Sequence, residues 1–410
     1  MTLRVHLFPY RTQKLSSVVP KIVGWRRPVK IGRCQHIKCP PNRVGVFLFK
    51  SRVIKSRVTD MNFTQNQKSV WDFFKTTEKP IILYGMGDGA DKVLDQFDKL
   101  GIHVYGVMAS DDFVRGQNFR GFTVKKLSDF ENELEDFVIA LCFASSLPDV
   151  MEHIKSVAER HTLLVPSVPV FGENIFNEKF YKDNEKLFNR AYELLEDELS
   201  RKVFRDIIAF QYSGDIKILE GCTTDKSEAF QILKLEESED YLDLGAYNGD
   251  TIEEFLNYCG GSFSSITAFE PNAKSFRKLQ DYCSDLRNVN LWQLGSYNKN
   301  TLINFNTKSG RNCAIDENGT PVQVARVDTI LCGKRITYAK LDVEGAEKET
   351  FEGMENTIKL FKPKLNVALY HRSEDIFSLI LQLNELNPDY KFFLRHHPYI
   401  PHWDTNLYCI

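Results

Sequence analysis

The residues best placed to do chemistry lie in one stretch of the chain, from Tyr241 to Thr251. An apolar run ends at Leu244, Gly245 and Gly249 follow it, and an acid, Glu270, ends the next apolar run. A buried strand, a glycine turn and the start of a helix are typical of units that hold a nucleotide. A carboxylate after the second strand can accept hydrogen bonds from both hydroxyls of a ribose. The stretch therefore predicts a nucleoside site.

The spacing of the glycines indicates which nucleoside is bound. A turn that binds a pyrophosphate has the pattern Gly-x-Gly-x-x-Gly, but Tyr247 and Asp250 occupy the places of its second and third glycines. Side chains inside the turn favour a nucleoside with an amino-acid tail, as in S-adenosylmethionine. Asp243 would then meet the ammonium group of that tail, directly or through water. A glycine turn with a structural role alone is the alternative.

A second dense cluster runs from Ile336 to Glu347 and reads as a strand that ends in acids at a glycine turn. Because side chains alternate along a strand, Lys340, Asp342 and Glu344 should lie on one side. His371 ends another predicted strand near the same rim.

These rim residues are candidates for a general base. Asp342, Glu344 and His371 could each take a proton, and we favour His371 because its unperturbed pKa lies nearest neutrality. A hydrogen-bonded structural histidine is the alternative. A metal between the acids finds no support in any further ligand cluster, so we expect none.

An earlier stretch also matches a nucleotide-binding pattern. The apolar run Ile81-Ile82-Leu83-Tyr84 precedes Gly85-x-Gly87-x-x-Ala90, and Asp111 follows the next predicted strand. This is the dinucleotide fingerprint, in which backbone N–H groups face a phosphate at a helix N-terminus. The match is short, and a tight turn that binds nothing is as good an interpretation.

Several other elements have clear patterns. Residues 180–208 predict one or two helices, and Asp250 and Thr251 are expected to cap the helix that follows Gly249. One helix is expected after Gly345, with an apolar face made of Phe351, Met354, Ile358 and Phe361.

Strands that alternate with helices predict an α/β protein with parallel sheets. We expect two doubly wound Rossmann-like domains joined by helices. The predicted divisions are a basic extension at 1–60, a Rossmann-like domain at 61–170, a helical linker at 171–237 and a second domain at 238–410. The extension has Asp60 as its only acid and is expected to be poorly ordered and dispensable. A transit peptide or a basic arm for nucleic acid are the alternatives.

Composition excludes several classes of partner. The net charge of −2 favours neither nucleic acid nor a membrane surface, and no apolar run is long enough to span a bilayer. The nine cysteines are scattered and odd in number, which is unlike a disulfide framework. We therefore expect a cytoplasmic protein without membrane or nucleic-acid partners.

At this point the motifs resemble those of a known family. Residues from about 238 to 410 are similar to the FkbM-type methyltransferases, which use S-adenosylmethionine and have a seven-stranded doubly wound fold. The resemblance is carried by Leu242 to Thr251, Ala268 to Asn272, Lys340 to Glu347, Lys362 to Lys364 and Tyr370-His371.

The resemblance implies O-methyl transfer, often to a sugar or another hydroxylated metabolite. It implies that S-adenosylmethionine contacts Asp243, Gly245, Asn248, Gly249 and Glu270. Residues 79–165 resemble more loosely a domain that binds nucleotide-sugars, so a nucleotide-sugar is a candidate ligand there.

Three functions follow as hypotheses. The first is an O-methyltransferase that acts on a small-molecule or glycan acceptor. The second is a nicotinamide-dependent oxidoreductase that uses Gly85 to Ala90. The third is a non-enzymatic nucleotide-binding module.

Overall fold

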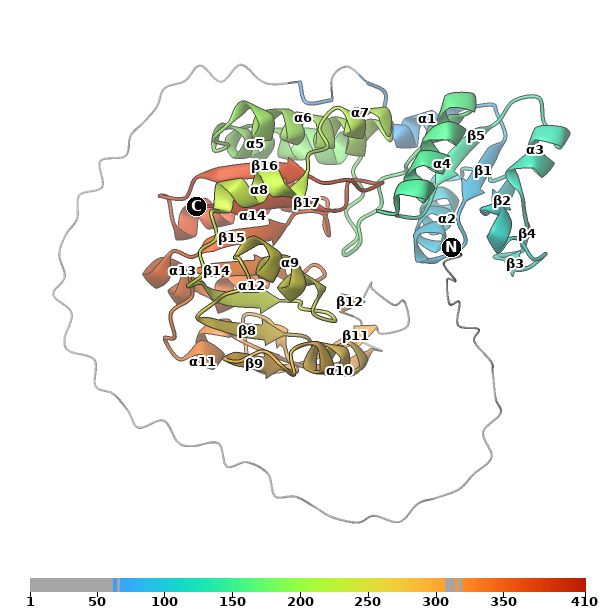
Figure 1. Ribbon diagram of the computed structural model, residues 1–410. Coiled ribbons are helices and arrows are strands. Elements are labelled where there is room, and N and C mark those ends of the chain that lie inside the picture. Colours follow the sequence, from blue (N-terminus) through green and yellow to red (C-terminus); the bar gives the residue numbers. More distant parts are fainter. Residues whose placement is uncertain (1–61, 65–66, 307–313, 316–318) are drawn as a thin grey trace, which may run out of the picture. The chain divides into compact units, whose positions relative to one another are not determined.

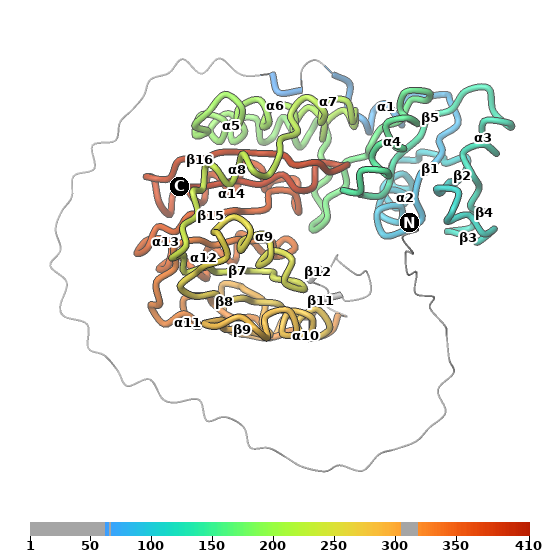
Figure 2. The backbone as a smooth tube through the Cα atoms, viewed as in Figure 1, coloured from blue at the N-terminus to red at the C-terminus, as the bar shows by residue number. Residues whose placement is uncertain are grey.

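The computed structural model describes residues 62–64, 67–306, 314–315 and 319–410. They belong to one compact unit that begins at Arg57. The expectations for residues 1–60 lie outside the described residues. Figure 2 follows the described chain from the first sheet through a run of helices to the second sheet.

The first sheet has six strands in the order β3-β4-β2-β1-β5-β6, and only β3 runs antiparallel to its neighbour. Its strands are β1 (Ile81–Tyr84), β2 (Gly106–Met108), β3 (Asn118–Phe119), β4 (Phe122–Lys125), β5 (Val138–Leu141) and β6 (Thr162–Leu164). Its helices are α1 (Val70–Thr76), α2 (Asp88–Leu100), the 3₁₀ turn η1 (Asp111–Phe113), α3 (Leu127–Glu133) and α4 (Pro148–Arg160).

Strand β1 is buried on both faces. Ile81 and Leu83 pack with α1 and α2 in one core, while Ile82 and Tyr84 pack in the other. A strand covered on both faces reads as an unbroken apolar run, which is why it was visible in the sequence.

Four helices connect the two sheets: α5 (Glu178–Glu193), α6 (Glu198–Ser213), α7 (Lys217–Glu220) and α8 (Lys226–Leu233). The helical pattern over 180–208 is confirmed as two helices. Asp197 caps α6 by accepting a hydrogen bond from the backbone N–H of Ser200 (2.7 Å).

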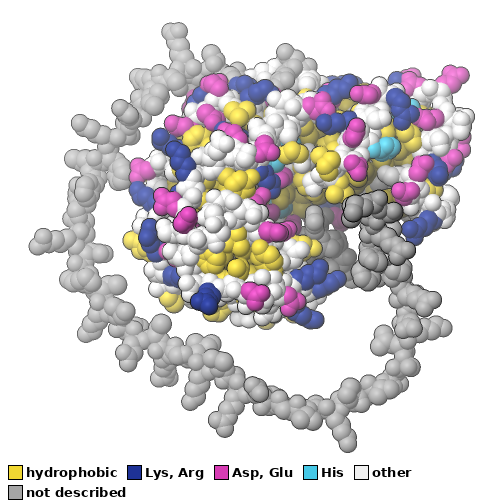
Figure 3. Space-filling model, viewed as in Figure 1, with side chains coloured by type: hydrophobic (Ala, Val, Ile, Leu, Met, Phe, Trp, Pro, Cys, Tyr) yellow, Lys and Arg dark blue, Asp and Glu magenta, His cyan; other side chains and the backbone are white. Residues whose placement is uncertain are grey.

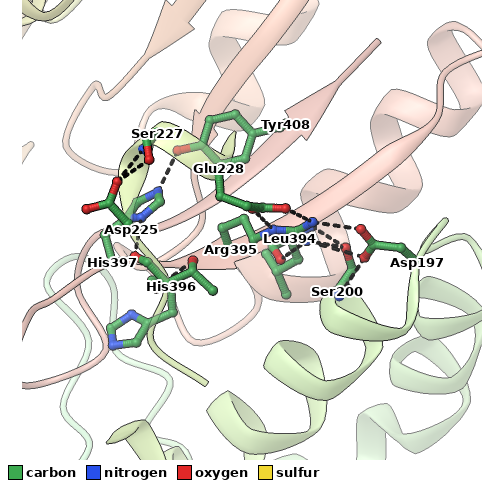
Figure 4. A network of polar contacts seen from close by, with 11 residues as sticks. Asp197, Ser200, Asp225, Ser227, Glu228, Leu394, Arg395, His396, His397 and Tyr408 are labelled. Carbon is green, nitrogen blue, oxygen red and sulfur yellow. Dashed lines mark hydrogen bonds and ion pairs between the residues drawn. The ribbon is translucent and has the colours of Figure 1, made fainter. Parts of the chain in front are cut away.

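A buried arginine ties these helices to the second sheet. Arg395 donates to Asp197 (2.7 Å), Ser200 (2.8 Å) and Glu228 (2.9 Å), and Figure 4 shows the three partners converging on its guanidinium. Two carboxylates compensate the buried charge, so loss of either would leave the arginine unbalanced.

The second sheet has seven strands in the order β16-β17-β15-β14-β7-β8-β9. They are β7 (Asp240–Leu244), β8 (Ser265–Phe269), β9 (Val289–Trp292), β14 (Tyr338–Leu341), β15 (Lys364–Ala368), β16 (Phe392–His396) and β17 (Thr405–Cys409). Its helices are α9 (Asp250–Tyr258), α10 (Ala273–Tyr282), α11 (Val327–Leu331), α12 (Glu347–Gly353), α13 (Glu355–Phe361) and α14 (Asp375–Leu386).

Only β17 runs antiparallel in that sheet, pairing with β15 on one side and β16 on the other. The chain leaves β7 toward β8 on one side and later returns to β14 on the other side (Figure 1). This reversal makes the carboxyl ends of β7 and β14 the switch point of the sheet, where open α/β sheets bind ligands. The predicted fold class, with two doubly wound sheets joined by helices, is confirmed.

A small third sheet has the order β10-β13-β11-β12, and its strands all follow β9 in the chain. Its strands are β10 (Gly295–Ser296), β11 (Thr301–Asn306), β12 (Ala314–Ile315) and β13 (Thr320–Ala325).

Three local predictions are wrong in detail. The helix expected after Gly345 is broken at Met354 into α12 and α13. Helix α9 has Gly249 as its N-cap and no side-chain cap, because Asp250 already lies in its first turn. Strand β14 ends at Leu341, so Glu344 is presented by the following turn and not by strand alternation.

Candidate functional site

A cavity of about 460 Å³ lies at the switch point of the second sheet. Its wall includes Gly245 and Tyr247 after β7, Glu270 after β8, and Asp342 and Glu344 after β14. The volume lies within the range of about 300–1,000 Å³ that is typical of small-ligand sites. The structure therefore brings the two motifs found in the sequence to one cavity.

The turn after β7 and the acid after β8 hold each other. Tyr247 donates its backbone N–H to Oε2 of Glu270 (2.9 Å), and Asn272 donates its own to Oε1 (2.7 Å). Burial raises the pKa of Glu270 to about 7, although both backbone donors act against the rise. Each carboxylate oxygen has a second lone pair, so Glu270 can still accept two ribose hydroxyls.

Tyr247 is in the left-handed region at φ +45°, where side chains other than glycine are uncommon. Its ring lines the cavity, and its N–H is one of the two donors to Glu270. The sequence predicts only that the side chain of Tyr247 lies inside the turn. That its backbone N–H orients Glu270 was not predicted.

Asp243 lies behind the cavity wall. Its side chain is fully buried, and Oδ2 accepts a hydrogen bond from the hydroxyl of Thr251 (2.5 Å). Burial raises its pKa to about 6, and Lys340 offsets part of that rise. Thr251 lines the cavity and Asp243 does not, so Asp243 would act on a ligand through Thr251 or water.

Asn248 and Gly249 also stand back from the cavity wall. Gly249 has φ +97°, and a Cβ there would lie 2.7 Å from the ring of Tyr282. Asn248 Oδ1 accepts a long hydrogen bond from the N–H of Asp250 (3.4 Å). Both residues shape the turn that carries the wall.

His371 is enclosed by three carboxylates and is 1% exposed. Its Nδ1 lies 2.9 Å from Oε1 of Glu347, and its Nε2 lies 3.4 Å from Asp342 and 3.5 Å from Glu344. Burial disfavours the charge, but Glu347, Glu344 and Asp342 outweigh it and raise the pKa of His371 to about 10. At neutral pH the ring is a charged imidazolium.

The two acids facing that imidazolium differ. Burial opposes ionisation of Asp342, but Lys340 and His371 outweigh it, and Tyr370 donates a hydrogen bond (3.0 Å), so its pKa is lowered. Burial raises the pKa of Glu344 to about 7, an effect that His371 only partly offsets. Glu344 is at φ +54° and its side chain is 35% exposed, so the turn holds it toward the cavity.

Asp342, Glu347 and His371 have ligand atoms within 4.8 Å of one another, which is close enough to hold a metal. A metal bound there would require a neutral imidazole. Without a metal, the positive charge of His371 compensates the three carboxylates around it.

The segment after the first sheet locks the turn that carries Glu344. Phe171 donates its backbone N–H to the carbonyl of His371 (2.8 Å), and its ring lies 4.1 Å from the Arg372 guanidinium. Arg372 in turn donates to the carbonyl of Gly345 (2.9 Å). A Cβ at Gly345 would lie 2.7 Å from Phe171, which explains the glycine at that place.

Several wall residues were missed in the sequence. They are Ser146 and Val170 from the first part of the chain, Lys226 and Glu254 from helices, and Tyr399, Trp403 and Asp404 from the loop between β16 and β17. No local motif marks them, because each reaches the cavity through long-range packing.

The turn after β1 is built differently. Gly89 lies against the next strand, since a Cβ there would be 2.3 Å from the carbonyl oxygen of Cys142. Gly85 has φ +128° and packs against Phe143. Asp111 is 67% exposed and lies 3.5 Å from Lys126. None of these residues lines the cavity at the second sheet.

Comparisons with known proteins agree with this geometry. Residues 243–401 match the family model described as the methyltransferase FkbM domain. No curated protein matches the chain in sequence.

Among solved structures, a methyltransferase FkbM from Methylobacillus flagellatus KT is similar with a TM-score of 0.64 and 18% identity, over 81% of this chain and 90% of that chain. The likeness therefore extends beyond the residues that match the family model. Fibrillarin from Aeropyrum pernix, solved with S-adenosyl-L-methionine, has a TM-score of 0.30 and 14% identity over 45% of this chain and 73% of that chain. That score is too low to bear on the architecture.

Proposed function

We propose that this chain, whose residues 243–401 match the FkbM methyltransferase family model, is an S-adenosylmethionine-dependent methyltransferase that methylates a hydroxyl of a sugar, a glycan or a related small metabolite. The observation that carries the proposal is the single cavity with Gly245, Tyr247 and Glu270 in one part of its wall and Asp342 and Glu344 in another. A nucleoside donor and a hydroxyl acceptor can meet there.

The residues present fit the donor. Glu270 has free lone pairs for the ribose, and Gly245 leaves its turn without a side chain at the switch point. Asp243 is buried beside the Tyr241 hydroxyl, so the ammonium group of the donor would reach its carboxylate only through water or Thr251. When bound, S-adenosylmethionine supplies a methyl group already activated by its sulfonium.

We assign the proton acceptor to Glu344 in place of His371. Glu344 would take the proton that the acceptor hydroxyl loses, and S-adenosylmethionine would supply the methyl group to that oxygen and leave, with its carbon–sulfur bond broken, as S-adenosylhomocysteine. A base with a pKa near the working pH suits this step, and the pKa of Glu344 is about 7. His371 holds a proton on each nitrogen until the pH approaches 10, so it cannot take another.

His371 then becomes a positioning residue. Its imidazolium lies between Asp342 and Glu344, and Glu347 holds its other side. A base that is already oriented within hydrogen-bond reach of the acceptor lowers the entropic part of the activation barrier and so raises turnover. Asp342, held by Lys340 and Tyr370, is placed to accept a second hydrogen bond from the acceptor.

The first sheet is proposed to dock or orient the acceptor, and a nucleotide-sugar remains a candidate ligand at its Gly85 turn. A cytoplasmic location remains part of the proposal, and the six described cysteines are all free. Among the described residues, no helix is both long and apolar enough to cross a bilayer.

A thermal-shift panel tests the proposal. We expect S-adenosylmethionine and S-adenosylhomocysteine to raise the melting temperature of the full chain, and NAD to leave it unchanged. A shift with NAD but not with S-adenosylhomocysteine would favour the oxidoreductase hypothesis. No shift with any nucleoside would count against all three hypotheses.

A further inference from the structure

Three aromatic rings stand together on the cavity wall. Tyr370, Tyr399 and Trp403 all line it. The rings of Tyr370 and Trp403 lie 6.5 Å apart at 22°, and those of Tyr399 and Trp403 lie 6.0 Å apart at 39°. The hydroxyl of Tyr370 donates to Asp342, so this aromatic wall adjoins the acid rim.

The loop that carries Tyr399 and Trp403 is fixed to the first sheet. Ser145 and Ile400 exchange two backbone hydrogen bonds, of 2.7 and 3.0 Å. Ser146, the next residue, lines the same cavity. The position of the loop that carries Tyr399 and Trp403 is therefore fixed by backbone hydrogen bonds to a segment from the first part of the chain.

The charged groups of the cavity wall are mostly acids. They are Asp250, Glu254, Glu270, Asp342, Glu344 and Asp404, against Lys226, Lys340 and His371. On the face shown in Figure 3, by contrast, basic and acidic side chains are interspersed.

Each basic group of the wall already has an acidic partner. Lys226 lies 2.9 Å from Glu254 and 3.5 Å from Asp404. Lys340 lies 3.3 Å from Asp342, and His371 lies among its three carboxylates. A phosphate in the cavity would meet these acids and would have to displace one of them to reach a cation.

Aromatic faces next to carboxylates bind ammonium groups. The ring quadrupole attracts a cation by about 0.5–2 kcal/mol, and more strongly when water is excluded. A nearby carboxylate adds a charge-assisted hydrogen bond. The same combination repels phosphate, so a positively charged ligand should bind more tightly than a negatively charged one.

We propose that the acceptor of this methyltransferase carries a protonated amine beside its hydroxyl, and that the aromatic wall of Tyr370, Tyr399 and Trp403 binds that amine. This inference rests on the proposed function and narrows it to amine-bearing acceptors.

The test is a calorimetric titration of the full chain already saturated with S-adenosylhomocysteine, so that the ammonium of that ligand is in place. Three sugars of the same ring size serve as probes: glucosamine, glucose and glucose 6-phosphate. At about pH 7, glucosamine should bind at least about tenfold more tightly than glucose, and glucose 6-phosphate should bind more weakly than either.

Two variants locate the effect. Trp403→Ala should bring the affinity ratio of glucosamine to glucose close to one, whereas Trp403→Phe, which keeps an aromatic face, should retain most of it. Unchanged binding of S-adenosylhomocysteine shows that each variant has folded.

Equal affinity for glucose and glucosamine, tighter binding of glucose 6-phosphate, or no binding of any sugar to the loaded protein would each overturn the proposal. Failure of S-adenosylhomocysteine itself to bind is a separate result, which would overturn the proposed methyltransferase site and not only its acceptor class.

Discussion

The chain contains two strand–glycine–helix turns at the switch points of two parallel sheets, and they differ in what surrounds them. The turn after β1 matches the dinucleotide pattern better, yet its Gly89 is occupied in packing against Cys142. The turn after β7 has the poorer pattern and its Gly245 is packed just as closely, since a Cβ there would lie 1.9 Å from the carbonyl oxygen of Asp342, yet this turn borders a cavity of about 460 Å³.

The acids that follow the second strand differ as well. Asp111 is exposed and lies near Lys126, while Glu270 is buried and held by two backbone N–H groups. A glycine pattern alone therefore says that a backbone turns tightly. A ligand site also needs a buried, oriented polar group and walls brought from elsewhere in the chain.

The largest effect should come from the base. Glu344→Gln keeps the shape of the side chain but cannot accept a proton, so we expect turnover to fall by about 10²–10⁴-fold with little change in donor affinity. Single-turnover kinetics with an identified acceptor measures this. Wild-type turnover should also decline as the pH falls below about 7, because only ionised Glu344 accepts the proton.

Glu355→Gln is the matched control, since Glu355 is a surface residue that pairs with Lys359 on α13. It should leave turnover unchanged. Wild-type turnover in Glu344→Gln, together with a large loss in His371→Gln at constant donor affinity, would return the base to His371.

An added methyl group should be tolerated only at those turn positions that leave room for a Cβ. A Cβ at Gly245 would lie 1.9 Å from the carbonyl oxygen of Asp342, at φ +89°. Gly245→Ala should therefore lower the free energy of unfolding by at least about 3 kcal/mol.

Gly87→Ala in the first turn is the counterpart, because a Cβ there meets nothing within 4 Å. We expect its unfolding free energy to stay within about 0.5 kcal/mol of wild type. Chemical denaturation compares the two variants, and equal losses would show that the turns are under the same constraint.

The acids that follow β8 and β2, Glu270 and Asp111, can be compared by replacing each with alanine. Glu270→Ala removes charge-assisted hydrogen bonds to the ribose, so S-adenosylhomocysteine should bind about 1.5–3 kcal/mol more weakly. Asp111→Ala should leave that affinity unchanged. A loss in Asp111→Ala, or wild-type affinity in Glu270→Ala by calorimetry, would contradict the assignment of the nucleoside to the second sheet.

The smallest expected effect is the pH dependence of donor binding. Ionised Glu270 accepts the ribose hydroxyls, and burial raises its pKa to about 7 in the protein without ligand. Affinity for S-adenosylhomocysteine should therefore be constant above that pH. Below it, the affinity should fall by at most about tenfold per pH unit. Glu270→Gln, which does not titrate, should flatten the profile. A wild-type profile that rises toward acid pH would exclude this role.

Much of the fold could be predicted because it depends on local patterns. Apolar runs marked β1, β7 and β14, and glycines marked the turns after them. The ends of β7 and β14 were expected to share one rim because parallel strands at a switch point must do so.

The chemistry of His371 could not be predicted in this way. Its raised pKa depends on Glu347, which the sequence presents only as the start of a helix, and on Glu344, which a left-handed turn places. The unperturbed pKa of a histidine does not apply to His371, because three carboxylates raise it.

The outer wall of the cavity was invisible for a related reason. Ser146 and Trp403 are far apart in the chain, and the backbone pairing of Ser145 with Ile400 connects the segments that carry them. Such contacts follow from the pairing of two loops, one after β5 and one between β16 and β17, and no motif records them.

A crystal structure of the full chain with S-adenosylhomocysteine tests the central claim most directly. The account predicts that both ribose hydroxyls lie about 2.6–3.2 Å from Glu270, with the sulfur directed toward Glu344. A nucleoside seated instead at the Gly85 turn, with the cavity beside Gly245 holding no part of it, would contradict the account.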